Sequence, residues 1–250
     1  MMNMTETVKQ LLIINILFYV GSLIVGQPAY DVLALYFPEN PKFQFWQPLT
    51  HMFMHAVSPM HILFNMFALF SFGTLLERIW GGKKFLFFYI SCGLGAAALH
   101  IAVNYFSFYQ GLDILTSNGI SKESIMQLLQ EGKYDTRWEE LMTPVQLSGF
   151  IESYMVPAVG ASGAIYGILV AFAFIAPNAE LMLMFIPVPI KAKYFVPGLV
   201  AIDLFLGIKG QSLFGSGSGI AHFAHIGGAL VGFIMMWYWK KNSYNNKRWN

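Results

Sequence analysis

The stretch VGASGAIYG, Val159–Gly167, lies in the middle of a long uncharged segment and has two readings. A serine among small residues can let helices pack closely in lipid, as small-xxx-small motifs do. The same serine can be a nucleophile, and it would then work inside a membrane. The choice between these readings depends on which other polar residues lie at the same depth.

The composition is that of an integral membrane protein. Of the 250 residues, 56% are hydrophobic and 11% are charged, and the mean hydropathy is +0.54. Soluble domains carry about a quarter charged residues. We expect a single membrane domain over residues 1–250, with a membrane core over 10–240 and a tail over 241–250. Lys and Arg are too scattered for a nucleic-acid surface, and the single Cys92 excludes an internal disulfide.

Apolar segments predict six membrane-spanning helices, since each crossing needs about 20 mostly apolar residues. Five segments qualify readily: Gln10–Gly26, Met60–Leu76, Phe85–Tyr105, Pro157–Ala176 and Ala221–Trp239. A sixth has only 15 residues between Lys193 and Lys209 and contains Asp203. It spans only if it extends backwards into FIPVPIKAK or lies in a thinned bilayer. The first segment is longer than a usual signal-peptide core, so we interpret it as an uncleaved span.

The basic residues predict the orientation. In a six-span arrangement, ten of the 15 Lys and Arg residues lie on the side of the two termini. These ten are Lys9, Arg78, Lys83, Lys84, Lys191, Lys193, Lys240, Lys241, Lys247 and Arg248, and the other five are Lys42, Lys122, Lys133, Arg137 and Lys209. The positive-inside rule therefore places both termini in the cytoplasm.

Three loops have distinctive sequences. The first, from Gln27 to Ser58, is rich in aromatic residues and proline, which suits the headgroup region. The third, from Ser107 to Val156, is long. It contains SKESIMQLLQ, with a capping pattern from Ser121 to Ser124, and the amphipathic WEELMTPVQLSGFIESYM, so we expect short helices on the outer surface. The fifth, KGQSLFGSGSGIAH, is rich in Gly and Ser, which favours a flexible cap over a cavity.

Four polar residues from three predicted helices fall at one depth. Ser162 lies about 7 Å below the outer end of the fourth span, and His225 about 7 Å below the start of the sixth near Ile220. His61 and Asn65 are four residues apart on one face of the second span and bracket a similar depth. Polar residues within a membrane face the protein interior and tend to mark function, so we expect these four to meet.

These residue types complement one another chemically. A serine hydroxyl is a poor nucleophile without a base, and His225 can accept the Ser162 proton. Attack on an amide builds an oxyanion, which needs preorganised donors. His61, the Asn65 amide and the Ser162 backbone N–H can supply them.

The neighbouring residues have supporting roles in this interpretation. Gly160 and Gly163 allow backbone and substrate to approach closely. Tyr166 follows Ser162 by one helical turn, where its ring can pack against the His225 imidazole. We place His222 nearer the surface, in a supporting position. The alternative is that the glycines and Ser162 serve only packing, and that His225 and Asn65 only bridge helices.

Together these motifs resemble those of the rhomboid intramembrane serine proteases. GASG followed by Tyr166 is similar to the family's G-x-S-G and its tyrosine four residues later. AHFAHIGGALVG is similar to the last-helix motif, which implies that His225 is the base and that Gly228 and Gly232 pack that helix tightly against the fourth.

Two further blocks extend the resemblance over about Phe45 to Trp239. HMFMHAVSPMHILFNM is similar to the second-helix block and carries His61 and Asn65. FGTLLERIWGGKKF is similar to the pattern that follows, in which Glu77 is implied to be a structural hydrogen-bonding acid.

The resemblance implies an intramembrane serine endopeptidase of the bacterial type, in the inner (plasma) membrane. It implies a six-helix fold and a Ser162–His225 dyad that faces the outside of the cell. Its partners would be the lipid bilayer and substrate proteins whose transmembrane helices it cuts near the outer leaflet. We expect no metal, no cofactor and no nucleic acid, and no motif indicates an oligomeric state.

The chain departs from the family pattern at three places. Many relatives have Trp-Arg where this chain has Trp46-Gln47, which puts the anchoring of the first loop in question. The third loop is longer than in the minimal family form. Asp203 is unexpected; it can touch His225, but we favour a carboxylate that faces outward or pairs with another helix.

Two other classes of protein compete with a peptidase. The first is an inactive rhomboid-like protein that binds membrane helices, against which the intact set of Ser162, His225, His61 and Asn65 argues. The second is a metal or haem protein that uses the histidines. Carboxylates are scarce near the shared layer, and we expect His100 to lie deeper or on another face. The six histidines are His51, His55, His61, His100, His222 and His225.

Overall fold

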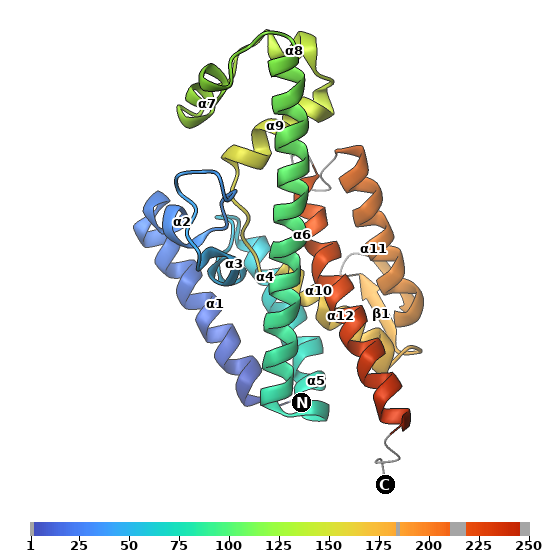
Figure 1. Ribbon diagram of the computed structural model, residues 1–250. Coiled ribbons are helices and arrows are strands. Elements are labelled where there is room, and N and C mark those ends of the chain that lie inside the picture. Colours follow the sequence, from blue (N-terminus) through green and yellow to red (C-terminus); the bar gives the residue numbers. More distant parts are fainter. Residues whose placement is uncertain (1–2, 184–185, 211–218, 246–250) are drawn as a thin grey trace.

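The computed structural model describes residues 3–183, 186–210 and 219–245, and most of them are helical. The long helix α6 runs through the middle of the molecule and the other helices surround it (Figure 1). The first half of the chain forms α1 (Glu6–Val25), α2 (Gln27–Leu33), α3 (Gln47–Thr50), the turn η1 (His51–Phe53), α4 (Pro59–Ala68), the π-helical turn η2 (Leu69–Gly73), α5 (Thr74–Trp80) and α6 (Gly82–Ser117). The second half forms α7 (Lys122–Gln130), α8 (Trp138–Leu141), α9 (Pro144–Met155), α10 (Ser162–Ile175), α11 (Ala192–Lys209) and α12 (Ile220–Asn245).

The predicted helical membrane architecture is confirmed. Within the described ranges, 4 helices are long and apolar enough to cross a membrane: Glu6–Val25, Pro59–Trp80, Gly82–Ser117 and Ile220–Asn242. Helix α10 is apolar but has only 14 residues, and α11 has 18 residues that include Asp203 and two lysines. The count of six spans therefore stays a prediction.

Two predicted segments differ in secondary structure from what was expected. Helix α6 continues to Ser117, so the first part of the segment predicted as the third loop is a helical extension of the third span. The helix continues because Phe108, Leu112 and Leu115, at i, i+4 and i+7, form one buried face. The fourth span does not begin as a helix at Pro157, since α10 starts at Ser162. The segment before it is extended, and Ala158 forms an antiparallel bridge with Leu35.

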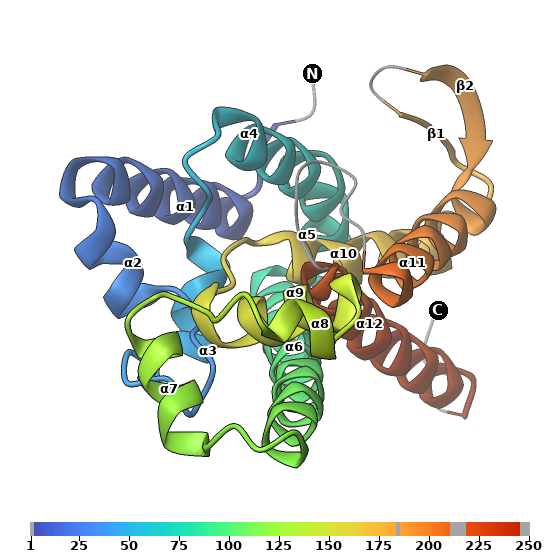
Figure 2. The same cartoon turned by 90° about the horizontal axis from the view of Figure 1, so that it is seen from above.

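The segment before α11 is also not the helix that a backward extension of the fifth span required. It forms an antiparallel hairpin of β1 (Glu180–Leu183) and β2 (Ile186–Lys191), in which Glu180 pairs with Lys191. The hairpin projects away from the helices in the view from above (Figure 2). Prolines at positions 187 and 189 prevent a helix there, because proline lacks the N–H group and clashes with the preceding turn.

The arrangement in Figure 1 places the start of α1 and the end of α12 at one end of the molecule, and α7 and α8 at the other. A chain that crosses the membrane an even number of times has both termini on the same side. The predicted fifth-loop cap, KGQSLFGSGSGIAH, falls mostly outside the described residues.

Glycines bring α10 and α12 into backbone contact. A methyl group added at Gly228 would lie 1.8 Å from the carbonyl oxygen of Gly163, and one added at Gly232 would lie 2.7 Å from the Cα atom of Gly167. Both helices thus carry a small-xxx-small face, which permits close approach in a membrane. The glycines of Val159–Gly167 therefore do serve packing, and this leaves the role of the serine between them open.

Glu77 caps the first helix. Its carboxylate accepts hydrogen bonds from the Thr5 hydroxyl at 2.5 Å, the Thr7 N–H at 2.9 Å and the Val8 N–H at 2.8 Å. These N–H groups belong to the first turn of α1, where no intrahelical acceptor exists and a negative charge is favourable. The structural role that the resemblance implied for Glu77 is confirmed, and it joins α5 to α1.

The third loop forms the short helices that the sequence predicted. Ser121 caps α7 by accepting from the Ser124 N–H at 3.3 Å, and Thr143 and Gln146 form a full capping box on α9. These helices and the outer part of α6 share a hydrophobic core that also includes Phe37 of the first loop. Its largest fully buried members include Trp138, Phe108, Phe150 and Tyr154. The first and third loops are thereby packed together.

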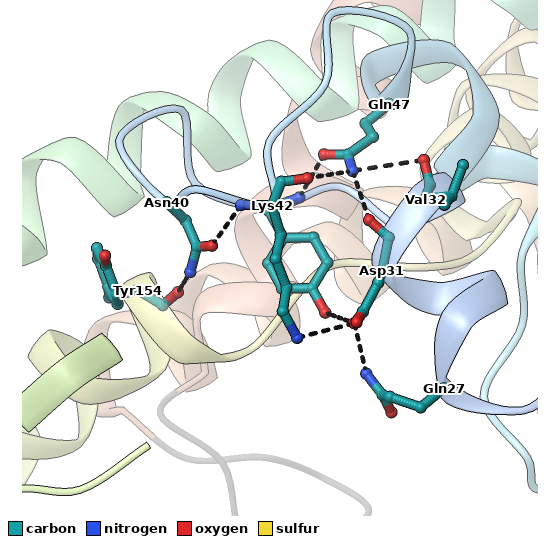
Figure 3. Close-up of polar contacts among 8 residues, drawn as sticks. Gln27, Asp31, Val32, Asn40, Lys42, Gln47 and Tyr154 are labelled. Carbon is teal, nitrogen blue, oxygen red and sulfur yellow. Dashed lines mark hydrogen bonds and ion pairs between the residues drawn. The ribbon is translucent and has the colours of Figure 1, made fainter. Parts of the chain in front are cut away.

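Gln47 anchors the first loop. The absence of an arginine at this position had put that anchoring in question. Its side chain is fully buried and reaches three parts of the loop (Figure 3). The amide nitrogen donates to the carbonyls of Lys42 at 2.9 Å and Asp31 at 3.2 Å, and the amide oxygen accepts from the Tyr36 N–H at 3.2 Å. A neutral amide supplies both donor and acceptor, so the loop is held without a buried charge.

A second set of contacts closes the same loop around Asp31. Its carboxylate accepts hydrogen bonds from Gln27, Tyr36 and Lys42 at 2.8–3.0 Å (Figure 3). Burial raises the pKa of Tyr36, and the hydrogen bond to Asp31 raises it further. The Tyr36 hydroxyl therefore stays a neutral donor to this carboxylate.

Candidate active site

Ser162 and His225 meet at the contact between α10 and α12. Ser162 is the first residue of α10, and its Oγ lies 2.9 Å from Nε2 of His225. The Tyr166 ring stacks on the His225 imidazole with ring centroids 4.4 Å apart and planes 11° apart. Tyr166 thus limits the rotation of the imidazole. This is the hydrogen-bonded pair of hydroxyl and imidazole that serine hydrolases use.

The segment before Ser162 is held in an extended conformation by the first loop and η1. Leu35 and Ala158 exchange two backbone hydrogen bonds of 2.9 Å, and the Gly160 N–H donates to the His51 carbonyl at 3.0 Å. Gly160 has φ +130°, a conformation that L side chains rarely adopt. The chain therefore enters the site as an extended segment with one β-bridge, and α10 begins at Ser162. The first N–H groups of α10 have no acceptor within their helix, and Ser162 contributes one of them.

His61 faces this turn from α4. Its Nδ1 accepts a hydrogen bond from the Ala56 N–H at 3.0 Å, so the proton of the neutral ring lies on Nε2. The Nε2 edge points toward Gly160, because a methyl group added there would lie 3.1 Å from both Nε2 and Cε1 of His61. Ser162 Oγ would be 3.4 Å from the same methyl group. A fixed N–H donor thus lies beside the serine.

Asn65 lies one turn further along α4 and borders the same cavity. One N–H of its amide donates to the His61 backbone carbonyl at 2.7 Å. An asparagine amide has two such hydrogens, so the second can donate elsewhere.

A cavity of about 650 Å³ joins these groups. Ser162, His225, His61, Asn65 and Gly160 all border it. His100 borders it as well, which corrects the expectation that this residue lies on another face. Its Nε2 is 3.1 Å from the Asn104 amide nitrogen, one turn away on α6.

Asp203 belongs to this site, through the pairing with another helix that was one of the two expected alternatives. It is only 2% exposed on α11, and its Oδ1 contacts Nδ1 of His222 and lies 3.4 Å from Nδ1 of His225. It does not face outward; it pairs with α12 through both histidines. His222 is likewise buried, at 8% exposure, and precedes His225 by almost one turn near the start of α12.

A sequence signal for Asp203 existed in the spacing of the two histidines. His222 and His225 are three residues apart and therefore share one face of α12. A carboxylate that pairs with one of them must lie near the other. Tyr166 also interacts electrostatically with Asp203, so three ionisable side chains, Asp203, His222 and Tyr166, lie around the imidazole that faces Ser162.

The six histidines do not form one metal or haem centre. Within the part of the chain that the structure describes, the group with metal-ligand spacing is Asp203, His222 and His225. His51 pairs through Nδ1 with the Gln47 carbonyl at 3.1 Å, and His55 with the Phe53 carbonyl at 3.3 Å.

Comparison with known proteins assigns the family. The Rhomboid domain model matches residues 42–242, so the chain belongs to the rhomboid family and is an integral multi-pass membrane protein. It is 28% identical over 182 residues to rhomboid protein 1 of mitochondria from Saccharomyces cerevisiae, covering 72% of this chain and 38% of the yeast protein. It is 28% identical over 200 residues to the rhomboid protease AarA of Providencia stuartii, covering 76% and 54%.

A third relative, the rhomboid protease GluP of Bacillus subtilis, is 26% identical over 192 residues, covering 76% of this chain and 25% of GluP. The matched region thus spans about half or less of the length of each of these relatives.

Proposed function

We propose that this chain is an intramembrane serine endopeptidase, with Ser162 as nucleophile and His225 as general base. The observation that carries the proposal is the 2.9 Å contact between Ser162 Oγ and His225 Nε2 at the border of a cavity. The membership of the rhomboid family and the names of two bacterial relatives as proteases support it.

The proposed reaction uses one imidazole twice. His225 Nε2 takes the Ser162 proton while Oγ bonds to the substrate carbonyl carbon. The same Nε2–H then protonates the amine as the C–N bond breaks, which leaves an acyl-enzyme. Water attacks the ester carbonyl carbon while His225 Nε2 takes its proton; the C–Oγ bond then breaks, His225 returns that proton to Ser162 Oγ, and the acid product leaves.

Three donors would hold the oxyanion of each tetrahedral intermediate. They are His61 Nε2–H, the second N–H of the Asn65 amide and the Ser162 backbone N–H. The hydrogen bond from Ala56 fixes the His61 tautomer before substrate arrives, and such preorganisation makes an oxyanion hole effective. Asp203 would accept the Nδ1–H of His225 and keep its Nε2 lone pair directed at Ser162, which makes it a positioning residue.

The substrates we propose are transmembrane helices of other proteins. The carbonyls of a helix are hydrogen-bonded within it, so a helix must unwind before Ser162 can attack. Gly and Pro near the cleavage site lower the cost of unwinding. The extended segment at residues 157–161 would lie beside the unwound substrate.

Labelling by a fluorophosphonate tests the nucleophile. The intact protein in detergent should react with the probe, and Ser162→Ala should not, because only an activated hydroxyl attacks the phosphorus centre. Ser153→Ala is the matched control, since this buried serine donates to the Phe150 carbonyl in α9 and should not affect labelling. Equal labelling of Ser162→Ala, or none of the intact protein, would favour the inactive rhomboid-like binder.

The oxyanion hole gives a second prediction. His61→Ala should slow cleavage of a transmembrane substrate by about 10²–10³ in kcat, the usual effect of losing one such donor. Asn65→Ala should act in the same direction, and the double variant shows whether the two donors substitute for each other. Thermal unfolding of each variant checks that the fold is kept. Full turnover by His61→Ala across several substrates would show that His61 is not an oxyanion donor.

The orientation is a third prediction. We propose that both termini lie in the cytoplasm of a bacterial cell and that the site opens to the outside across the plasma membrane. A topology reporter fused after Asn250 should be cytoplasmic, and one inserted after Asn118 should be external. The reverse pattern would place the Ser162 cavity on the cytoplasmic side.

A further inference from the structure

Three potential zinc ligands surround one point behind the proposed catalytic imidazole. Asp203 Oδ1, His222 Nδ1 and His225 Nδ1 all lie within 4.8 Å of one another. The side chains of these residues are 3%, 10% and 24% exposed, respectively. His225 is shared between this cluster and the active-site cavity, which it borders.

The donor set and its spacing fit Zn²⁺. Two imidazoles and one carboxylate with a fourth position for water make a familiar tetrahedral zinc site. Zinc bonds of about 2.0–2.1 Å place tetrahedral ligand atoms roughly 3.3 Å apart. Asp203 Oδ1 and His225 Nδ1 are already 3.4 Å apart. The shorter contact between His222 and Asp203 would open by a small side-chain rotation as the ion entered.

Zinc at this point would change the tautomer of His225. In the proposed mechanism Nδ1 carries the proton and Nε2 carries the lone pair that accepts the Ser162 proton. A metal bound to Nδ1 uses the lone pair of that nitrogen and displaces its proton. The single proton of the neutral ring then lies on Nε2. Nε2–H then donates toward Ser162 and has no lone pair left. His225 stays 2.9 Å from Ser162 but can no longer act as a base.

We propose that Asp203, His222 and His225 form a reversible inhibitory zinc site on the proposed peptidase. The inhibition rests on the proposed function, whereas the binding does not. Mg²⁺ should not replace Zn²⁺, because it prefers six oxygen ligands in octahedral geometry.

Calorimetry on the inactive Ser162→Ala variant tests binding separately from catalysis. Titration of the full chain in detergent with zinc chloride should show one site, and titration with magnesium chloride should not. Adding His222→Asn should weaken zinc binding at least about tenfold. Asparagine keeps a donor to Asp203 but is a poor zinc ligand. His55→Asn is the control, because it removes a buried histidine outside the cluster and should leave the affinity unchanged.

Cleavage of a transmembrane substrate by the otherwise unaltered chain tests inhibition. Zinc should stop cleavage and a chelator should restore it, and cleavage by His222→Asn, relative to its own zinc-free rate, should persist at zinc concentrations that stop the parent. No binding by Ser162→Ala, or equal binding by its His222→Asn derivative, would overturn the site. Full activity of the parent with zinc bound would overturn the inhibition. If the parent never cleaves substrate, the proposed function fails and calorimetry still decides on the site.

Discussion

His225→Ala should abolish both cleavage of a transmembrane substrate and labelling by a fluorophosphonate. His225 Nε2 is 2.9 Å from Ser162 Oγ, and it is the group placed to take the serine proton. Without a base the hydroxyl is almost unreactive, and removal of such a histidine costs roughly 10⁴–10⁶ in kcat in serine proteases. The imidazole also packs against Tyr166, so unfolding of the variant should be measured alongside activity.

His222→Ala is the matched control on the same helix face. The His222 ring centroid lies 6.2 Å from that of His225, and its Nδ1 contacts Asp203 and not the serine. The variant should therefore keep measurable activity on the substrate used for His225→Ala. An inactive His222→Ala together with an active His225→Ala would overturn the proposed dyad and make His222 the base.

Much of the site could be predicted because polar residues are rare in an apolar chain. Ser162, His225 and His61 stand out in segments with few other polar side chains, and a polar group in a membrane must find a polar partner. The structure brings these three around one cavity. The sequence also predicts the long membrane helices, because a sustained apolar run is typical of a membrane-spanning helix. These are α1, α6 and the central part of α12.

The route of the chain into the site could not be predicted from hydrophobicity. Residues 157–161 are apolar and adjoin an apolar helix, so their sequence predicts the first turns of that helix. The predicted depth of Ser162 rests on a helical rise over these residues, and they are not helical. The extended path depends on the Leu35–Ala158 bridge and on the φ of Gly160, which are tertiary features. Ser162 reaches His225 because an extended segment with one bridge to Leu35, and not one and a half turns of helix, leads to it.

Asp203 and Gln47 escaped prediction for a related reason. Each is a single polar residue whose partners are distant in sequence: Asp203 pairs with histidines about twenty positions away, and Gln47 pairs with loop carbonyls. The spacing of His222 and His225 marks a shared helix face, but the local sequence does not identify the partner on another helix. For the short fifth span the sequence left two alternatives, a backward extension or a thinned bilayer, and the hairpin before α11 excludes the first.

Gly228→Ala should separate α12 from α10 and remove activity without touching a reacting group. The added methyl group would lie 1.8 Å from the Gly163 carbonyl oxygen and 2.5 Å from its carbonyl carbon. Both are backbone atoms, so no side-chain rotation relieves the clash and the helices must move apart. Overpacking costs about 1–3 kcal/mol, which corresponds to a fall in Tm of roughly 2–12 °C for a chain of this size.

The catalytic consequence of that movement follows from position along the helices. Gly228 is one turn from His225 on α12, and Gly163 directly follows Ser162 on α10. A displacement large enough to admit a methyl group therefore lengthens the 2.9 Å contact between His225 and Ser162.

Gly21→Ala in α1 is the matched control, since a methyl group there meets nothing within 4 Å. By helix propensity it should leave Tm equal or slightly higher. Unfolding in detergent and turnover of one substrate, measured on both variants, decide the point: a Gly228→Ala protein with parental Tm and turnover would contradict the backbone contact on which the whole site depends.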